Sequence, residues 1–106
     1  MIKEITADEL SKSFRSVLVI DVREISEYES GHVPGAVNIP LSGFAQRLGE
    51  VSKTQAVFMI CRSGARSMQA CEFCVDEGYE NIVNISDGTI GWINRGHEIV
   101  VGGQKG

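Results

Sequence analysis

The sequence predicts an α/β fold in which helices cover both faces of a mostly parallel β-sheet. Two near-continuous apolar runs, at residues 17–22 and 56–60, have the composition of strands that are buried on both faces of a sheet. Strand and helix patterns also alternate along the whole chain. This alternation implies right-handed crossovers between parallel strands, with helices packed on either side.

Capping signals and short apolar stretches place the other elements. A capping box, with Thr6 as the N-cap and Glu9 three residues later, starts a helix that is expected to reach about Phe14. Gly31 and Gly78 are expected to end two later helices. Further strands are expected at residues 2–5, 36–39 and 82–85, and further helices at residues 24–30, 42–48, 67–76 and around Trp92.

Length and composition limit the class of protein. The chain has 106 residues, so we expect one domain over residues 1–106, with the glycine-rich residues 102–106 as a flexible tail. The formal net charge of −4 argues against a nucleic-acid or membrane-surface partner, which requires a basic patch. The acidic residues, Glu27 among them, are scattered and are expected on solvated faces. No signal peptide or membrane-length apolar run is found, so a cytoplasmic location is expected.

The segment at residues 60–67, which reads ICRSGARS, carries the strongest chemical signal. It joins a buried strand to a helix, and loops of this kind lie where ligands bind in open α/β sheets. The backbone N–H groups of a tight loop and the positive end of the following helix dipole together form an anion site. The residues expected to form this site are Arg62, Ser63, Gly64, Ala65, Arg66 and Ser67.

Cys61 stands at the mouth of this loop and is the predicted nucleophile. The electropositive surroundings favour the thiolate, so its pKa should fall below the free value of about 8.5. A persulfide sulfur on Cys61 is also anionic and would be held by the same groups. Interpreting Cys61 as a small core residue fits poorly, because two arginines and a glycine follow within five residues.

The chain resembles a single-domain rhodanese, a thiosulfate-type sulfurtransferase. The resemblance rests on the loop above and on further motifs in the family's order, which together cover nearly the whole chain. They read DVRE at residues 21–24, EY at 27–28, GHVPGAVNIP at 31–40, GY at 78–79 and GTIGW at 88–92.

The resemblance implies a five-stranded parallel sheet flanked by helices and a two-step reaction. Cys61 would accept a sulfane sulfur from thiosulfate or another donor, and pass it to cyanide or a thiol. The expected partners are therefore a small-molecule donor and acceptor, or a persulfide-carrying or thioredoxin-like protein. No cofactor, metal, nucleic acid or membrane is expected, and the chain is expected to be a monomer or a weak dimer.

Two alternatives from other classes share this fold. In dual-specificity phosphatases of the cell-cycle type, five residues separate the cysteine from the arginine, whereas four separate Cys61 from Arg66. An arsenate reductase of the same fold is the related alternative. The shorter loop forms a smaller ring of N–H groups, which suits sulfur better than a tetrahedral phosphate. An interaction module without catalysis is disfavoured because Cys61 is present. A relay that moves sulfur between dedicated proteins, with little use of thiosulfate, remains open.

Other reactive side chains receive structural interpretations. Cys71 and Cys74 are expected to face the core of a helix rather than to bind zinc or form a redox pair. Asp21 and Arg23 follow a buried strand, and they either support the site through a charge-assisted hydrogen bond or form a surface pair. Asp87 replaces a glycine that the family commonly has, and it either weakens an anionic donor or starts the next turn.

Overall fold

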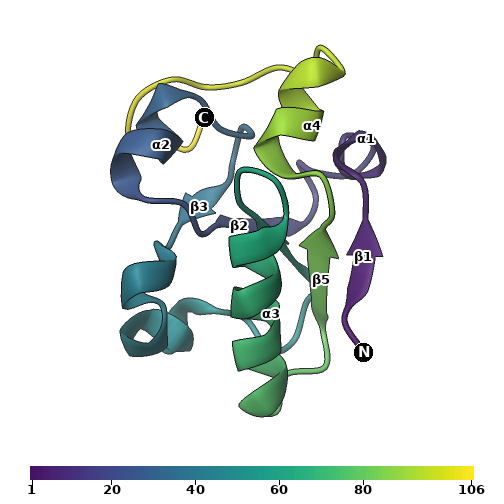
Figure 1. Ribbon diagram of the computed structural model, residues 1–106, viewed down its shortest axis with the longest axis vertical. Helices are drawn as coiled ribbons and strands as arrows, with labels where there is room; N and C mark the ends of the chain where they lie inside the picture. The colour runs from purple at the N-terminus through teal and green to yellow at the C-terminus, as the bar shows by residue number, and fades with distance from the viewer.

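A single sheet of five parallel strands organises the molecule (Figure 1). The computed structural model describes all of residues 1–106. The strands are β1 (Lys3–Ile5), β2 (Leu18–Asp21), β3 (Val37–Asn38), β4 (Val57–Ile60) and β5 (Ile82–Ile85). They lie in the order β1-β5-β4-β2-β3, and every neighbouring pair is parallel, as the alternation of elements predicts.

Helices cover both faces of the sheet. They are α1 (Ala7–Leu10), α2 (Ile25–Ser30), α3 (Ala65–Asp76) and α4 (Gly88–Asn94), together with the 3₁₀ segments η1 (Leu41–Gly43) and η2 (Ala45–Glu50). Met59 of β4 packs in one buried cluster with Cys71 of α3. The next residue, Ile60, packs in a second cluster with Leu10 of α1 and Trp92 of α4. Successive strand side chains therefore enter opposite cores, which explains why β4 is apolar throughout.

Two predicted helices differ from the structure. The capping box at Thr6 and Glu9 is present, but the helix ends at Leu10 rather than at Phe14. The Ser11 hydroxyl donates a hydrogen bond back to the Asp8 carbonyl at 2.6 Å, and such bonds compete with helix continuation. The helix expected at residues 42–48 is instead two short 3₁₀ segments, in a stretch where two glycines lower helix propensity.

The connections between strands diverge at β2 and β4. From β2 the chain passes through α2 to β3 on one side, whereas from β4 it passes through α3 to β5 on the other side. Ligands of open α/β sheets bind where connections diverge in this way, beyond the carboxyl ends of the strands. Asp21 is in register with Ile60, so the segments that follow these residues leave the sheet side by side.

The chain end lies across α2 and the turn that follows it (Figure 1). The backbones of His32 and Val100 form an isolated antiparallel bridge, and the Gly102 N–H donates to the Glu29 carbonyl at 2.7 Å. The Lys105 carbonyl accepts a hydrogen bond from the Gly35 N–H. These contacts hold residues 102–106 against the rest of the molecule. The expected flexibility of this tail stays a prediction. None of the helices is long and apolar enough to cross a membrane.

Candidate active site

Two glycines allow the loop after β4 to fold tightly against its neighbours. Gly64 has φ +102°, and a Cβ atom there would lie 2.4 Å from the Ser86 carbonyl oxygen. Gly88 has φ +59°, and its Cβ would lie 2.4 Å from the Arg62 carbonyl oxygen. Side chains rarely adopt such backbone angles, and real Cβ atoms do not approach other atoms so closely. Glycine at both positions therefore brings the loop against the segment that joins β5 to α4.

The sulfur of Cys61 is buried among hydrogen-bond donors. Only 1% of the residue is exposed, and its Sγ accepts hydrogen bonds from the Gly64 N–H at 3.1 Å and the Ser67 hydroxyl at 3.3 Å. Burial by itself raises the pKa of the Cys61 thiol, but hydrogen bonds from Ser67, Gly64 and Ser63 outweigh it, so this pKa lies below its ordinary value. The predicted direction of the shift is confirmed, with neutral dipoles as the main cause of the lowering.

Replacing Ser67 by alanine should raise the pKa of Cys61, because the thiolate loses its largest stabilising hydrogen bond. We expect the pH midpoint of alkylation by iodoacetamide to move upward, with severalfold slower alkylation at pH 6. Ser63→Ala is the matched control, because Ser63 contributes only its backbone N–H, which alanine keeps. An unchanged midpoint in the Ser67 variant would contradict the role of this hydroxyl.

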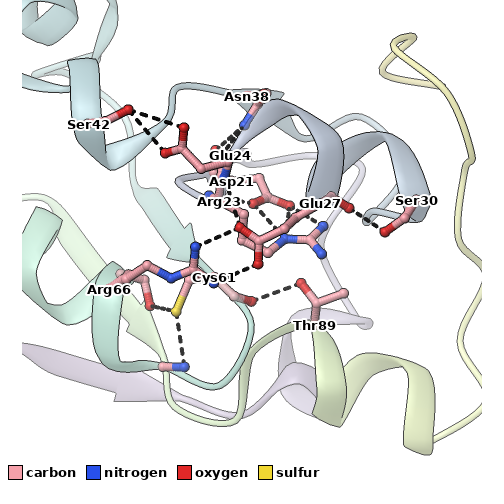
Figure 2. A network of polar contacts seen from close by, with 12 residues as sticks. Asp21, Arg23, Glu24, Glu27, Ser30, Asn38, Ser42, Cys61, Arg66 and Thr89 are labelled. Carbon is pink, nitrogen blue, oxygen red and sulfur yellow. Dashed lines mark hydrogen bonds and ion pairs between the residues drawn. The ribbon is translucent and has the colours of Figure 1, made fainter.

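Residues distant in sequence hold the loop in place. The Thr89 N–H and hydroxyl both donate to the Cys61 carbonyl at 2.9 Å, and Figure 2 shows the contact from the hydroxyl. The Asn84 amide donates to the Gly64 carbonyl at 3.2 Å. Both side chains are buried. Neither residue was predicted from the sequence, because their contacts exist only once β5 and α4 are folded beside the loop.

Arg66 is engaged by a carboxylate that the sequence analysis placed on a solvated face. The Glu27 carboxylate accepts hydrogen bonds from both terminal nitrogens of Arg66, at 2.7 and 2.9 Å (Figure 2). This pairing lowers the pKa of Glu27 to about 2. Glu27 is thus partly exposed, as expected, but its carboxylate is bound by Arg66 rather than solvated alone. Because Glu27 binds it, the Arg66 guanidinium is not a free cation beside the loop. Its role as an anion ligand stays a prediction.

The other predicted loop residues lie around the mouth of the site. Arg62, Ser63 and Ala65 are exposed, and Arg62 forms no ion pair. Gly64 precedes the first turn of α3 and Ser67 lies in that turn, so the positive end of the helix dipole is directed toward Cys61. The structure thus brings together a buried thiol, a ring of donors and one free cation. This arrangement stabilises an anionic sulfur.

Comparison with known proteins identifies the family. A family model described as a rhodanese-like domain matches residues 6–95. The chain belongs to the rhodanese-like family. It is 36% identical over 103 residues to a protein of Allochromatium vinosum named sulfurtransferase, and the match covers 94% of this chain and 96% of that protein.

Two further comparisons agree with this assignment. A crystal structure of a rhodanese-related protein from Thermoplasma volcanium has a TM-score of 0.87 and 31% identity, covering 93% of this chain and 98% of that one. A protein of Bacillus subtilis named putative sulfur carrier protein YrkF is 36% identical over 83 residues. That match covers 78% of this chain and 45% of YrkF. The predicted rhodanese-like fold with a five-stranded parallel sheet is confirmed.

In this rhodanese-like domain, Asp21 and Arg23 form a buried pair beside the site. Their side chains are 0% and 7% exposed, so the interpretation as a surface pair was wrong. The Asp21 carboxylate accepts hydrogen bonds from the guanidinium, and one Arg23 nitrogen also donates to the Gly31 carbonyl at 2.8 Å. The pair thereby ties the end of β2 to the turn that follows α2. It makes no hydrogen bond to the loop at residues 61–67.

Asp87 supports a neighbouring helix rather than the mouth of the rhodanese-like site. Its carboxylate accepts a hydrogen bond from the Ala7 N–H at 2.7 Å, at the first residue of α1. Free backbone N–H groups at a helix start favour such an acceptor. Asp87 also immediately precedes α4, which agrees with the interpretation that it starts the next turn.

The remaining cysteines and His32 lie apart from the chemistry. Cys71 and Cys74 are fully buried in the core, where burial raises the pKa of Cys71 to about 12 and that of Cys74 to about 11. The core interpretation of both is confirmed. The ring nitrogens of buried His32 each lie 2.8 Å from a carbonyl oxygen, those of Tyr28 and Gln104. No group of three His, Cys, Asp or Glu side chains is placed to hold a metal ion.

Proposed function

We propose that this rhodanese-like domain is a sulfurtransferase in which Cys61 carries a sulfane sulfur as a persulfide. The observation that carries the proposal is the environment of the Cys61 sulfur. Donors from Gly64 and Ser67 surround it, and the start of α3 faces it. These groups stabilise negative charge without a neighbouring base. A nucleophile that starts and ends each cycle as an anion requires this kind of stabilisation.

In the first half of the reaction, the Cys61 thiolate attacks the outer sulfur of a donor such as thiosulfate. A bond forms between Sγ and this sulfur, the sulfur–sulfur bond of the donor breaks, and sulfite leaves with the electron pair. The product is the Cys61 persulfide anion, so no proton needs to be moved. We expect the backbone N–H groups of Ser63, Gly64 and Ser67, which stabilise the Cys61 thiolate, to stabilise the persulfide as well, and Arg62 adds a positive charge at the mouth.

In the second half, an acceptor such as cyanide or a thiolate attacks the outer sulfur of the persulfide. The bond between the two sulfurs breaks, and Cys61 leaves as the thiolate that the loop stabilises. A low pKa of Cys61 therefore assists this step as well, because a stabilised thiolate is a better leaving group. With cyanide the product is thiocyanate.

A phosphatase with this fold would need a free guanidinium to bind the equatorial oxygens of the transferred phosphoryl group. Arg66 is bound at both terminal nitrogens by Glu27, and the loop between Cys61 and Arg66 holds four residues. These features favour a single anionic sulfur over a tetrahedral phosphate. Hydrolysis of an aryl phosphate at a rate above that of sulfur transfer would count against the proposal.

The proposal is tested by mass spectrometry of the intact protein. After incubation with thiosulfate, and separately with cysteine persulfide, we expect the chain to gain the mass of one sulfur atom on the peptide that contains Cys61. Addition of cyanide should remove this mass and release an equal amount of thiocyanate. A protein that gains no sulfur from either donor would contradict the proposed function.

A further inference from the structure

The ion pair between Glu27 and Arg66 removes a cation from the site. Both side chains are 34% exposed, and the two hydrogen bonds use both terminal nitrogens of the guanidinium. The geometry is bidentate, which is the strongest form of this contact. Figure 2 shows the two side chains pointing toward one another, Glu27 from α2 and Arg66 from α3. An anionic ligand would have to displace the Glu27 carboxylate before it could use Arg66.

Arg66 is close enough to Cys61 for this pairing to matter. The charge of the Cys61 thiolate contributes to raising the pKa of Arg66, after the larger contribution of Glu27. Once Glu27 neutralises Arg66, the free cation of the loop is Arg62, which is exposed to solvent. The whole chain carries a formal net charge of −4, so the approach of a dianion is opposed at long range as well.

The Cys61 sulfur is also hard to reach. The residue is 1% exposed, and no cavity of the molecule is lined by Cys61 or by residues 62–67. We therefore expect the body of a donor to stay outside the loop, with only its terminal sulfur reaching Cys61. The outer sulfur of an alkyl persulfide is attached to an uncharged sulfur atom, so it should approach more readily than a sulfur attached directly to a charged sulfonate group.

We propose that Glu27 is a specificity-determining residue. Through its ion pair with Arg66, it lowers kcat/KM for dianionic donors such as thiosulfate relative to kcat/KM for hydropersulfides, R–S–SH. This proposal rests on the function proposed above. The Cys61 thiolate attacks the outer sulfur of R–S–SH, the sulfur–sulfur bond breaks, and R–S⁻ leaves. The proton of the outer sulfur then passes to R–S⁻, which gives the Cys61 persulfide anion and the thiol R–SH.

The test compares two donors in the full chain and in Glu27→Gln. Glutamine keeps the shape and one hydrogen bond to Arg66 but removes the charge. We expect the ratio of kcat/KM for thiosulfate to kcat/KM for cysteine persulfide to rise about tenfold, the scale of one charge-assisted hydrogen bond. The rise should come from a lower KM for thiosulfate. Using the ratio removes any effect of the variant on the thiolate itself, which both donors share.

Two further variants make the test specific. Glu29→Gln removes the same charge from the same helix at an exposed residue without an ion pair, so the donor ratio should not change. Adding Arg66→Gln to Glu27→Gln should abolish the gain for thiosulfate, because the freed guanidinium is what binds the dianion. An unchanged donor ratio in Glu27→Gln, or a gain that survives the loss of Arg66, would overturn this inference alone. Absence of sulfur transfer from both donors would instead overturn the proposed function on which it rests.

Discussion

Cys61→Ser is expected to abolish sulfur transfer to cyanide, lowering the rate by at least about a thousandfold. Serine keeps the size of the side chain, but its hydroxyl is not ionised at neutral pH and cannot carry a sulfane sulfur. Because serine fills nearly the same buried volume as Cys61, the substitution should leave the fold and the loop in place. Thiocyanate release from thiosulfate and from cysteine persulfide measures the loss, and circular dichroism checks the fold.

Cys74→Ala is the matched control for this variant. Cys74 is also a buried thiol, but burial raises its pKa to about 11, so it holds almost no thiolate at neutral pH. The control variant should keep most of the activity even if packing is weakened. The assignment of Cys61 would be wrong if Cys61→Ser retained more than a small share of the transfer, or if sulfur were found on the peptide with Cys71 and Cys74.

Much of the fold is predictable because its signals are local. The apolar run at residues 82–85 coincides with β5, and the capping box at Thr6 starts α1 as expected. The strand order, by contrast, was not predicted, since no local pattern says that β5 lies between β1 and β4. The segment at residues 42–48 was predicted as one helix because periodicity alone does not distinguish an α-helix from successive 3₁₀ turns.

The candidate site likewise has one part that could be predicted from the sequence and one part that could not. The loop at residues 61–67 is one continuous segment between a strand and a helix, so its chemistry could be inferred from the sequence alone. The groups that complete it come from elsewhere: Glu27 from α2, Thr89 from α4 and Asn84 from β5. Glu27 is 39 residues from Arg66, and only the divergence of the chain at β2 and β4 places them together.

This division explains why the role of Arg66 was the least predictable. An arginine beside a nucleophile indicates an anion site when it is considered with its neighbours in sequence. The structure adds a carboxylate that competes with the ligand for the same nitrogens. The charge available to a donor is therefore decided by a contact between two elements rather than by the loop itself.

Asp21→Ala should lower the free energy of unfolding by about 3–5 kcal/mol, the largest effect on stability that we expect from a polar side chain. The Asp21 side chain is 0% exposed and that of Arg23 is 7% exposed, so removal of the carboxylate leaves a guanidinium buried without its partner. The backbone N–H of Arg23 also loses its acceptor, Oδ1 of Asp21, at 3.0 Å. Urea denaturation monitored by circular dichroism measures the change.

An exposed ion pair in the same chain distinguishes the effect of burial on stability from the effect of pairing. Arg47 and Glu50 also form a two-point contact, at 2.7 and 2.9 Å, but their side chains are 41% and 50% exposed. Glu50→Ala should therefore destabilise the fold far less than Asp21→Ala, because water solvates the unpaired guanidinium. Replacing both members of the buried pair, as in Asp21→Ala with Arg23→Met, should recover part of the loss since no buried charge remains. If Asp21→Ala cost no more than Glu50→Ala, the pair beside β2 would not be the structural element that fixes the end of this strand against α2.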